Sequence, residues 1–249
     1  MERFFCLELL LGKEKLERLQ KSFVVVIGIG AVGGYAAEAL ARSGVGRLRL
    51  IDFDTIKITN FNRHLLAIEP NLGKLKAEAA KERIALINPR CDVEAVTGFA
   101  AVETIDGFLA GGPDLVIDAV DSLNPKAQIL EACYQKKVPV IASMGAALRT
   151  DVFSVRSGDL FKTSGCPLAR ELRSRLRRKG IKKGIFCVYS DTPAPKDRTP
   201  VLNAEEDYNR GRKRRKMGSL PTVTGVFGLT LAHQAVRYLT GDLSLPKPT

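Results

Sequence analysis

The chain has 249 residues, 45% hydrophobic and 27% charged, a composition typical of an ordinary globular α/β unit with an appendage. No apolar run approaches the roughly 20 residues that span a bilayer, and the N-terminus resembles no export signal. The five cysteines form no C-x-x-C pair, which argues against a disulfide framework or a zinc knuckle. We therefore expect a cytoplasmic protein with reduced thiols. The formal net charge of +12, from 39 Lys and Arg against 27 Asp and Glu, indicates an anionic partner larger than one nucleotide, with RNA as the first candidate.

A glycine-rich turn follows the first predicted strand. Residues 4–20 are predicted to form a partly apolar helix, and 23–27 (FVVVI) a strand buried on both faces. GIGAVG then matches G-x-G-x-x-G, and a stretch with helix composition follows. This context predicts a nucleotide phosphate site, in which Gly28 makes the turn, Gly30 admits the phosphate and Gly33 lets helix and strand pack closely. A glycine turn that serves packing alone is the alternative.

Acidic and basic residues follow the second predicted strand, at 47–51. An acid at the end of this strand, about 20 residues past the glycines, is where a ribose is usually held, and Asp52 and Asp54 stand there. Loop carboxylates that cap the next turn are the alternative. The segment TNFNRH comes next. Its Arg63 is suited to bidentate contact with phosphate, whereas we expect His64 to be packed or solvated rather than catalytic.

Two lysines and two acids mark the elements that follow. A helix is predicted from 73 to 87, and Lys74 and Lys76 near its start suggest a bound anion, because the helix dipole disfavours a cation there. Solvated surface lysines are the alternative. Asp118 and Asp121 stand at the end of a buried strand at 114–120. Together with phosphates, two such acids could hold a magnesium ion.

The alternation of strands and helices from 23 to 142 predicts an α/β fold with a doubly wound, mostly parallel, Rossmann-like sheet. Beyond residue 150 an alternating segment, a strand at 185–190 and an apolar helix at 221–239 are predicted to form an α+β extension. We expect one compact unit in which 1–150 bind the nucleotide and 151–249 form the C-terminal extension.

Basic residues cluster twice in the extension, in a predicted helix within 166–183 and in a predicted, partly mobile loop at 190–218. We expect both clusters to contact RNA phosphates, so that binding falls steeply with salt. A helix with solvated charge is the alternative for the first cluster. The candidate contacts are Arg173, Arg177, Arg178, Lys179, Arg212, Lys213, Arg214 and Arg215.

These pieces together resemble the family of ubiquitin-activating-like adenylating enzymes, of the ThiF, MoeB and HesA type. The matching segments are GIGAVGG, IDFD, TNFNRH, GKLKAE and DAVDS, in the family's order and spacing over residues 1–150. The resemblance implies that ATP activates a carboxylate as an acyl-adenylate, with release of pyrophosphate.

The resemblance also implies roles for individual residues. The implied ATP contacts are Gly28, Gly30, Ala31 and Gly33 in the turn, Asp52 at the ribose with Asp54 beside it, Asn60, Arg63 and Lys76 at the phosphates, and Asp121 through Mg2+. Arg63, Lys76 and Asp121 would act in catalysis, together with Arg3 from the partner subunit of a homodimer. Fixed cations and a metal ion would stabilise the charge that develops on the phosphate oxygens.

Within this family the chain looks closest to the branch of tRNA threonylcarbamoyladenosine dehydratases. The sulfur-carrier activators usually have two C-x-x-C pairs for zinc, which this chain lacks. DLFKTSGCPLARELRSRLRRKG, IFCVYSD and GSLPTVTGVFG resemble the dehydratase branch, and the net charge of +12 fits an RNA substrate. The resemblance implies adenylylation of the threonyl carboxylate of the modified adenosine beside the tRNA anticodon. A nitrogen of the same modification then closes the ring and expels AMP.

Two other functions stay open at this point. One is an adenylyltransferase that activates a ubiquitin-like sulfur-carrier protein, and the other is a non-catalytic nucleotide-binding module.

In the dehydratase interpretation ring closure is intramolecular, so no covalent enzyme intermediate is required. We therefore expect Cys166 and Cys187 to be structural, although Arg170 and Arg173 make Cys166 the better candidate thiol. A partner protein for sulfur transfer is also left open.

Overall fold

The computed structural model describes residues 2–193, 205–206, 214–215 and 217–246, with the backbone alone given for 205–206 and 214–215. The α-helices are α1 (Phe5–Leu11), α2 (Lys13–Lys21), α3 (Gly33–Arg42), α4 (Lys76–Ile87), α5 (Val102–Phe108), α6 (Leu123–Gln135), α7 (Pro167–Arg178) and α8 (Pro221–Leu239). The strands are β1 (Phe23–Ile27), β2 (Arg47–Asp52), β3 (Asp92–Thr97), β4 (Leu115–Asp118), β5 (Val140–Ser143), β6 (Val155–Asp159), β7 (Phe186–Ser190), β8 (Glu205–Glu206) and β9 (Arg214–Arg215). Short 3₁₀ turns are η1 (Glu2–Phe4), η2 (Ile58–Asn60), η3 (Glu69–Asn71), η4 (Val152–Ser154) and η5 (Leu160–Lys162).

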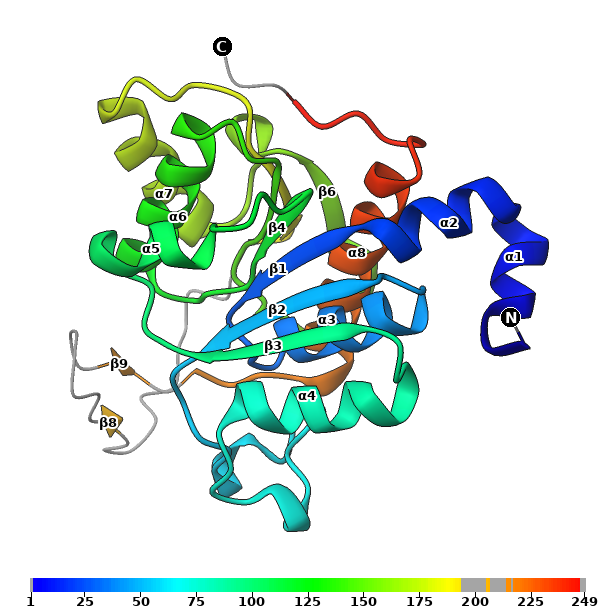
Figure 1. The fold of residues 1–249 in the computed structure, drawn as a ribbon. Coiled ribbons are helices and arrows are strands. Elements are labelled where there is room, and N and C mark those ends of the chain that lie inside the picture. Colours follow the sequence, from blue (N-terminus) through cyan, green and yellow to red (C-terminus); the bar gives the residue numbers. More distant parts are fainter. Residues whose placement is uncertain (1, 194–204, 207–213, 216, 247–249) are drawn as a thin grey trace.

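A seven-stranded sheet in the order β3-β2-β1-β4-β5-β7-β6 forms the centre of the fold (Figure 1). Its neighbouring strands pair in parallel, except that β6 is antiparallel to β7. The chain crosses from β3 to β4 at the switch point between β1 and β4. The crevice at the carboxyl ends of strands around such a point is where open α/β sheets bind ligands. The predicted doubly wound α/β fold is confirmed.

Helices cover both faces of the sheet. One apolar core lies between the sheet and α3, α4 and α8, and the other between the sheet and α5, α6 and α7. Every residue of β1 is buried, as expected for an apolar central strand with helices on both faces. Helix α8 lies against α3 so closely that a Cβ added to Gly228 would come within 2.4 Å of the Val32 carbonyl oxygen. Among the described residues, no helix is both long and apolar enough to cross a membrane.

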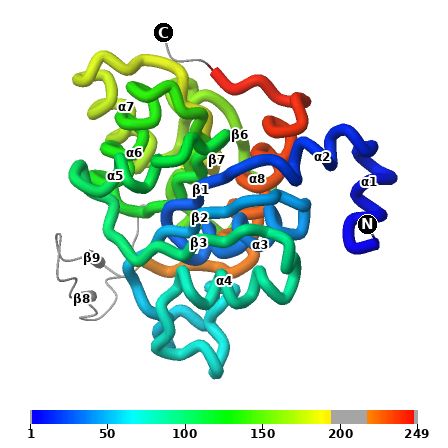
Figure 2. The backbone as a smooth tube through the Cα atoms, viewed as in Figure 1, coloured from blue at the N-terminus to red at the C-terminus, as the bar shows by residue number. Residues whose placement is uncertain are grey.

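The N-terminal segment forms two helices where one was predicted. Gly12 separates α1 from α2 with a φ of 82°, a conformation that favours glycine. Helix α2 buries two leucines in the core, whereas α1 buries none of its residues and projects to one side of the sheet (Figure 2). Phe5, Leu9 and Leu10 on α1 are 59%, 71% and 80% exposed.

The C-terminal extension shares the sheet of the nucleotide-binding region. Strand β7 pairs with β5, and β6 follows at the edge. The alternating segment predicted as a strand at 151–156 begins instead as the turn η4, because the Asp151 carboxylate accepts the Phe153 N–H at 2.8 Å and caps it. The functional division at residue 150 stays a prediction, and the loop at 190–218 lies largely outside the described residues.

Candidate active site

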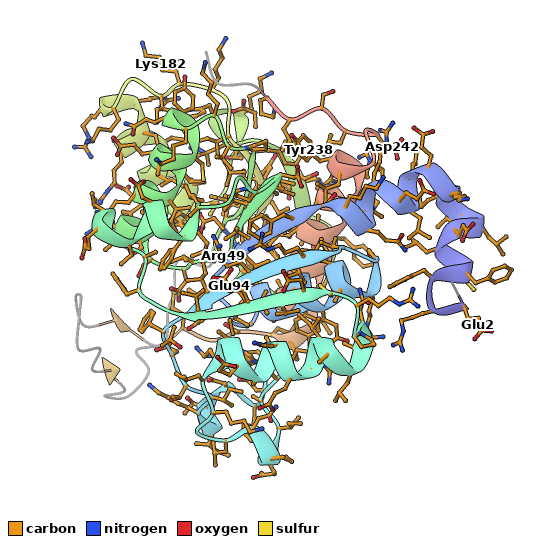
Figure 3. The ribbon with its side chains drawn as sticks, in the orientation of Figure 1. Glu2, Arg49, Glu94, Lys182, Tyr238 and Asp242 are labelled. Carbon is orange, nitrogen blue, oxygen red and sulfur yellow. The ribbon has the colours of Figure 1, made fainter. Side chains whose placement is uncertain are left out.

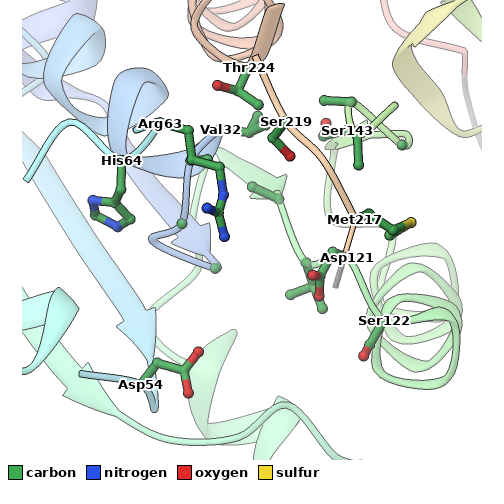
Figure 4. Close-up of a pocket in the computed structure, with 18 of the residues that line it drawn as sticks. Val32, Asp54, Arg63, His64, Asp121, Ser122, Ser143, Met217, Ser219 and Thr224 are labelled. Carbon is green, nitrogen blue, oxygen red and sulfur yellow. The ribbon is translucent and has the colours of Figure 1, made fainter. Parts of the chain in front are cut away.

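A cavity of about 810 Å³ opens at the carboxyl ends of β1, β2, β4 and β5. It is bounded by the glycine turn on one side and by segments from the C-terminal extension on the other (Figure 4). Nearly all the small-molecule contacts expected from the sequence line it: Gly28, Gly30, Ala31, Asp52, Asp54, Asn60, Arg63, Lys76 and Asp121. Gly33 lies beneath the turn, and Arg3 lies elsewhere.

Each of the three motif glycines is explained by a different structural feature. Gly28 has a φ of 91°, and a Cβ there would lie 3.0 Å from the Ala119 backbone. A Cβ on Gly33 would lie 1.8 Å from the Gly28 carbonyl oxygen, so α3 packs directly on the turn. Around Gly30, by contrast, a Cβ would meet nothing within 4 Å. The space above Gly30 is therefore open to a ligand, and no side chain caps the N-terminus of α3 behind it.

Asp52 ties the glycine turn to the end of β2. Its Oδ2 accepts the Ile29 N–H at 2.7 Å, and its Oδ1 accepts the Asp54 N–H at 2.8 Å. Burial raises the pKa of Asp52, while nearby Lys76 and these two N–H groups favour the carboxylate. Asp52 thus positions the turn and lies in the cavity wall at the same time.

Lys76 is a buried cation at the start of α4. Its Nζ lies 2.9 Å from the Asp54 Oδ2, and its backbone N–H donates to the Asp54 carbonyl at 3.0 Å. The carboxylate offsets the unfavourable position of a lysine at a helix N-terminus. Asp54 therefore positions Lys76 at the cavity wall, where its ammonium group can also contact an anionic ligand.

The loop after β2 carries Arg63 over the cavity. Its Nη1 donates to the Thr59 carbonyl at 2.7 Å and to the Asn62 Oδ1 at 2.9 Å, and its guanidinium extends toward the central space (Figure 4). Asn60 is buried, and its Oδ1 accepts the Lys57 N–H at 3.1 Å. This bond caps η2, so Asn60 shapes the loop from which Arg63 projects.

His64 is packed, as expected. The Leu66 N–H donates to His64 Nδ1 at 3.1 Å, so Nε2 carries the proton and donates to the Ile29 carbonyl at 2.6 Å. Burial lowers the pKa of His64 to about 4. A neutral imidazole therefore joins the Arg63 loop to the glycine turn.

Asp118 and Asp121 differ sharply in environment. Asp118 is fully buried: its Oδ2 lies 2.7 Å from Lys126 Nζ, and its Oδ1 accepts the Val120 N–H at 3.0 Å. Asp121 is exposed and lines the cavity. The expectation that both acids could hold magnesium is wrong for Asp118, because its oxygens are bonded inside the protein, away from the cavity. Lys126, its partner, is a residue that the sequence analysis missed.

Two aromatic residues in the cavity wall were also missed. Phe53, directly after Asp52, and Phe99 lie edge to face with ring centroids 5.2 Å apart. Their rings add apolar surface to the side of the cavity that Asp52 and Asp54 form, a surface suited to a flat base. The sequence does contain a signal for Phe53, which stands next to Asp52 at the carboxyl end of the predicted strand at 47–51.

Arg3 lies apart from the cavity of its own chain. It belongs to η1, and its guanidinium donates to the Ile87 carbonyl at the end of α4. Helix α2 leads from this segment into the amino end of β1, whereas the cavity lies at the carboxyl ends of the strands. The expected role of Arg3 in a partner's site stays a prediction.

The candidate thiols are both buried. Cys187 is fully buried, and burial raises the pKa of its thiol, which makes it unsuited to nucleophilic attack. Cys166 precedes α7 as its N-cap and lines the cavity. No observation gives either residue a catalytic role.

Helix α7 carries the first basic cluster. Arg177 and Arg178 are exposed, and Arg177 lies over the ring of Phe161. Lys179 forms an ion pair with Glu131 at 3.3 Å. Lys182 lies just beyond the helix at the edge of the molecule (Figure 3).

The remaining basic candidates differ in what the structure says of them. Arg173 is partly buried and donates to the Thr163 hydroxyl, so it anchors α7, and its RNA contact stays a prediction. Arg214 and Arg215 form β9, without described side chains, whereas Arg212 and Lys213 lie outside the described residues.

Comparison with known proteins covers nearly the whole chain. The profile of the ThiF family matches residues 5–249. The chain is 41% identical to the tRNA threonylcarbamoyladenosine dehydratase of Bacillus subtilis, over 96% of this chain and 95% of that protein. The crystal structure of the Escherichia coli tRNA N6-threonylcarbamoyladenosine dehydratase, TcdA, in complex with ATP aligns with a TM-score of 0.86 at 34% identity, over 97% of this chain and 95% of the other. The molybdopterin-synthase adenylyltransferase of Salmonella typhimurium is 35% identical over 59% of the chain. By this evidence the chain belongs to the ThiF family.

Proposed function

We propose that this protein is an ATP-dependent tRNA threonylcarbamoyladenosine dehydratase. The observation that carries the proposal is the extent and identity of the similarity: the Bacillus subtilis dehydratase matches 96% of the chain at 41% identity, whereas the molybdopterin-synthase adenylyltransferases match 57% to 72% of it at 33% to 35% identity. The match to the dehydratase therefore includes the C-terminal extension. The net charge of +12 supports an RNA substrate.

ATP would occupy the half of the cavity formed by the glycine turn and the ends of β2 and β3. The open space above Gly30 and the uncapped start of α3 suit the phosphates. Asp52 and Asp54 lie where a ribose is held, with Phe53 and Phe99 beside them for the base. The ATP complex of the E. coli relative supports ATP as the nucleotide.

Asp121 fits a magnesium ion, since Mg2+ takes one or two carboxylates together with phosphate oxygens. Its carboxylate is exposed at the cavity, and Asp118 is committed to Lys126. The ion would neutralise phosphate charge. Arg63 and Lys76 would do the same from fixed positions on the other side.

The reaction begins when an oxygen of the threonyl carboxylate attacks the α-phosphorus of ATP. The bond from this phosphorus to pyrophosphate breaks, and the carboxylate becomes an acyl-adenylate. A nitrogen of the same modification then attacks the acyl carbon, loses its proton and expels AMP, which carries away one carboxylate oxygen. The modified base loses the elements of one water. Because this second step is intramolecular, positioning alone can supply much of its acceleration.

We further infer a homodimer in which α1 of each subunit covers the other. Phe5, Leu9 and Leu10 give α1 an exposed apolar face, of the kind that marks a protein interface. Arg3 lies in η1, directly before α1, so a subunit packed on this face would lie near it, as the expected role of Arg3 in a partner's site requires. An RNA substrate also supports a cytoplasmic location.

Nucleoside mass spectrometry tests the function. The protein is incubated with ATP, Mg2+ and tRNA that carries threonylcarbamoyladenosine, and we expect the modified nucleoside to lose one water as AMP forms. Unchanged nucleosides, with exchange of pyrophosphate into ATP that depends on a small carrier protein ending in Gly-Gly, would favour the adenylyltransferase.

A further inference from the structure

The cavity continues past the nucleotide half into a second lobe. This acceptor lobe is lined by 143–149 at and after the end of β5, 166–168 at the start of α7 and 217–219 before α8. None of these segments contributes an expected ATP contact. In Figure 4, Ser143, Met217 and Ser219 lie across the cavity from Asp54, with Asp121 between the two sides.

Three helices begin at the wall of the acceptor lobe or next to it. They are α6, α7 and α8, whose N-cap residues are Ser122, Cys166 and Leu220. None of these three N-termini receives a side-chain capping bond. Pro167 and Pro221, the first residues of α7 and α8, have no N–H, so the free N–H groups of these two helices start at the second position. These N–H groups, those of α6 and the three helix dipoles favour an anionic group in this part of the cavity.

A buried arginine gives independent evidence for an anionic ligand. Arg149 lines the cavity, is 5% exposed, and donates to the carbonyls of Thr192 and Gly165. Within the described ranges no carboxylate forms an ion pair with it, and its Nε has no hydrogen-bond partner. Because a buried charge without a counter-ion is unfavourable, an anion bound in the lobe would be stabilised by Arg149.

We propose that the acceptor lobe binds the carboxylate-bearing arm of the modified adenosine and holds it facing ATP. The proposal rests on the proposed function. Helix α7 connects the lobe to the expected RNA surface, since it begins directly after Cys166 in the lobe and ends at Arg177 and Arg178. Its 12 residues span about 18 Å. A nucleotide whose base arm enters the lobe can thus have neighbouring phosphates at the far end of α7.

Glycines in the cavity wall allow each half to be filled separately. A Cβ on Gly145, in the acceptor lobe, would meet Cys166 Sγ at 3.9 Å and Leu168 Cβ at 4.0 Å, which are ordinary contacts. Gly218, in the same lobe, and Gly30, in the nucleotide half, have nothing within 4 Å of a Cβ. None of the three has a positive φ. Side chains placed here would therefore occupy ligand space without straining the backbone.

The test compares Gly145→Leu and Gly218→Leu with Gly30→Ala. The matched control is Gly107→Leu, at an exposed position of α5, where a Cβ also meets nothing within 4 Å. For the two lobe variants we expect KM for modified tRNA to rise about tenfold, the equivalent of one lost charge-assisted contact, with Kd for ATP unchanged. Gly30→Ala should weaken ATP binding instead, and Gly107→Leu should change neither.

The readouts are initial rates of nucleoside conversion and equilibrium ATP binding. Lobe variants with the KM of wild type and Gly107→Leu would overturn the inference, as would lobe variants that lose ATP affinity as Gly30→Ala does. Two lobe variants on different segments keep the test valid if one of them folds poorly. Absence of conversion by the wild type would instead contradict the proposed function itself.

Discussion

Lys126 Nζ lies 2.7 Å from Asp118 Oδ2, and both side chains are fully buried. The same lysine donates to the Asp118 carbonyl at 3.3 Å, and Asp118 holds the Val120 N–H. The pair therefore fixes the turn at 118–122, which carries Asp121 and forms the surface against which Gly28 packs. A buried ion pair thus lies beneath both halves of the cavity.

Breaking this pair should be costly for stability. Lys126→Met leaves the Asp118 carboxylate buried without its counter-ion, and we expect a loss of about 3 to 5 kcal/mol in the free energy of unfolding. Replacing both residues, with Asp118→Leu added, should recover part of that loss because no charge is left buried. Denaturant unfolding of the two variants checks this. A double variant less stable than Lys126→Met would contradict it.

Arg63 should matter to catalysis and little to folding. It is partly exposed, and its contacts are to its own loop, at Thr59 and Asn62. We expect Arg63→Ala to lower kcat about a hundredfold or more, since it removes a fixed cation from the developing charge, while thermal unfolding stays close to wild type. Full activity in this variant would refute the site assignment.

Asp121 and Asp118 should respond differently to substitution. Asp121→Asn keeps the shape of an exposed side chain, so we expect an intact fold, a loss of turnover and a higher Mg2+ requirement. Asp118→Asn should mainly lower stability, because it removes the partner of buried Lys126. Mg2+ titrations of the rate, together with unfolding curves, separate the two outcomes. An unchanged Mg2+ dependence in Asp121→Asn would count against the metal role.

His64 should make stability depend on pH in a defined window. Its pKa is lowered to about 4 in the folded protein, so between about pH 6.5 and 4 the unfolded chain binds the extra proton. Stability from His64 is therefore complete above that window and decreases as pH falls through it, by up to about 3 kcal/mol. The difference in unfolding free energy between wild type and His64→Gln, measured from pH 7 to 5, should shrink. A constant difference would show that His64 is not buried neutral.

The exposed end of α7 should contribute to tRNA affinity through phosphates. Arg177→Gln with Arg178→Gln should weaken binding and reduce the slope of log affinity against log salt, by up to about 0.9 for each lost phosphate contact. ATP binding should stay unchanged. Lys13→Gln with Lys21→Gln, which removes two exposed cations on α2, is the matched control. Equal effects of both pairs would mean that net charge, not α7, determines binding.

Local backbone geometry explains why the sequence revealed the glycine turn so well. Gly28, Gly30 and Gly33 are needed by the strand, turn and helix that contain them, so their spacing predicted the turn. The acids were less predictable. Asp118 and Asp121 look alike in the sequence, and only the fold shows that the first meets Lys126 inside the protein.

Non-local pairing accounts for what the sequence did not show. Strand β7 lies between β5 and β6 in the sheet, although β6 precedes β7 in the chain. The local sequence pattern does not contain this order. Arg149 reads as one basic residue among many, and its burial against Thr192 and Gly165 follows from three loops meeting at one point. The acceptor lobe depends on that meeting, so it emerged from the structure alone.

The most direct test of the proposed chemistry follows one oxygen atom. The tRNA substrate is prepared with a heavy-oxygen label in both oxygens of the threonyl carboxylate, and the AMP formed in one turnover is analysed by mass spectrometry. Attack of the carboxylate on the α-phosphorus predicts one labelled oxygen in AMP and none in pyrophosphate. Cyclised tRNA accompanied by unlabelled AMP would contradict activation of this carboxylate by adenylylation.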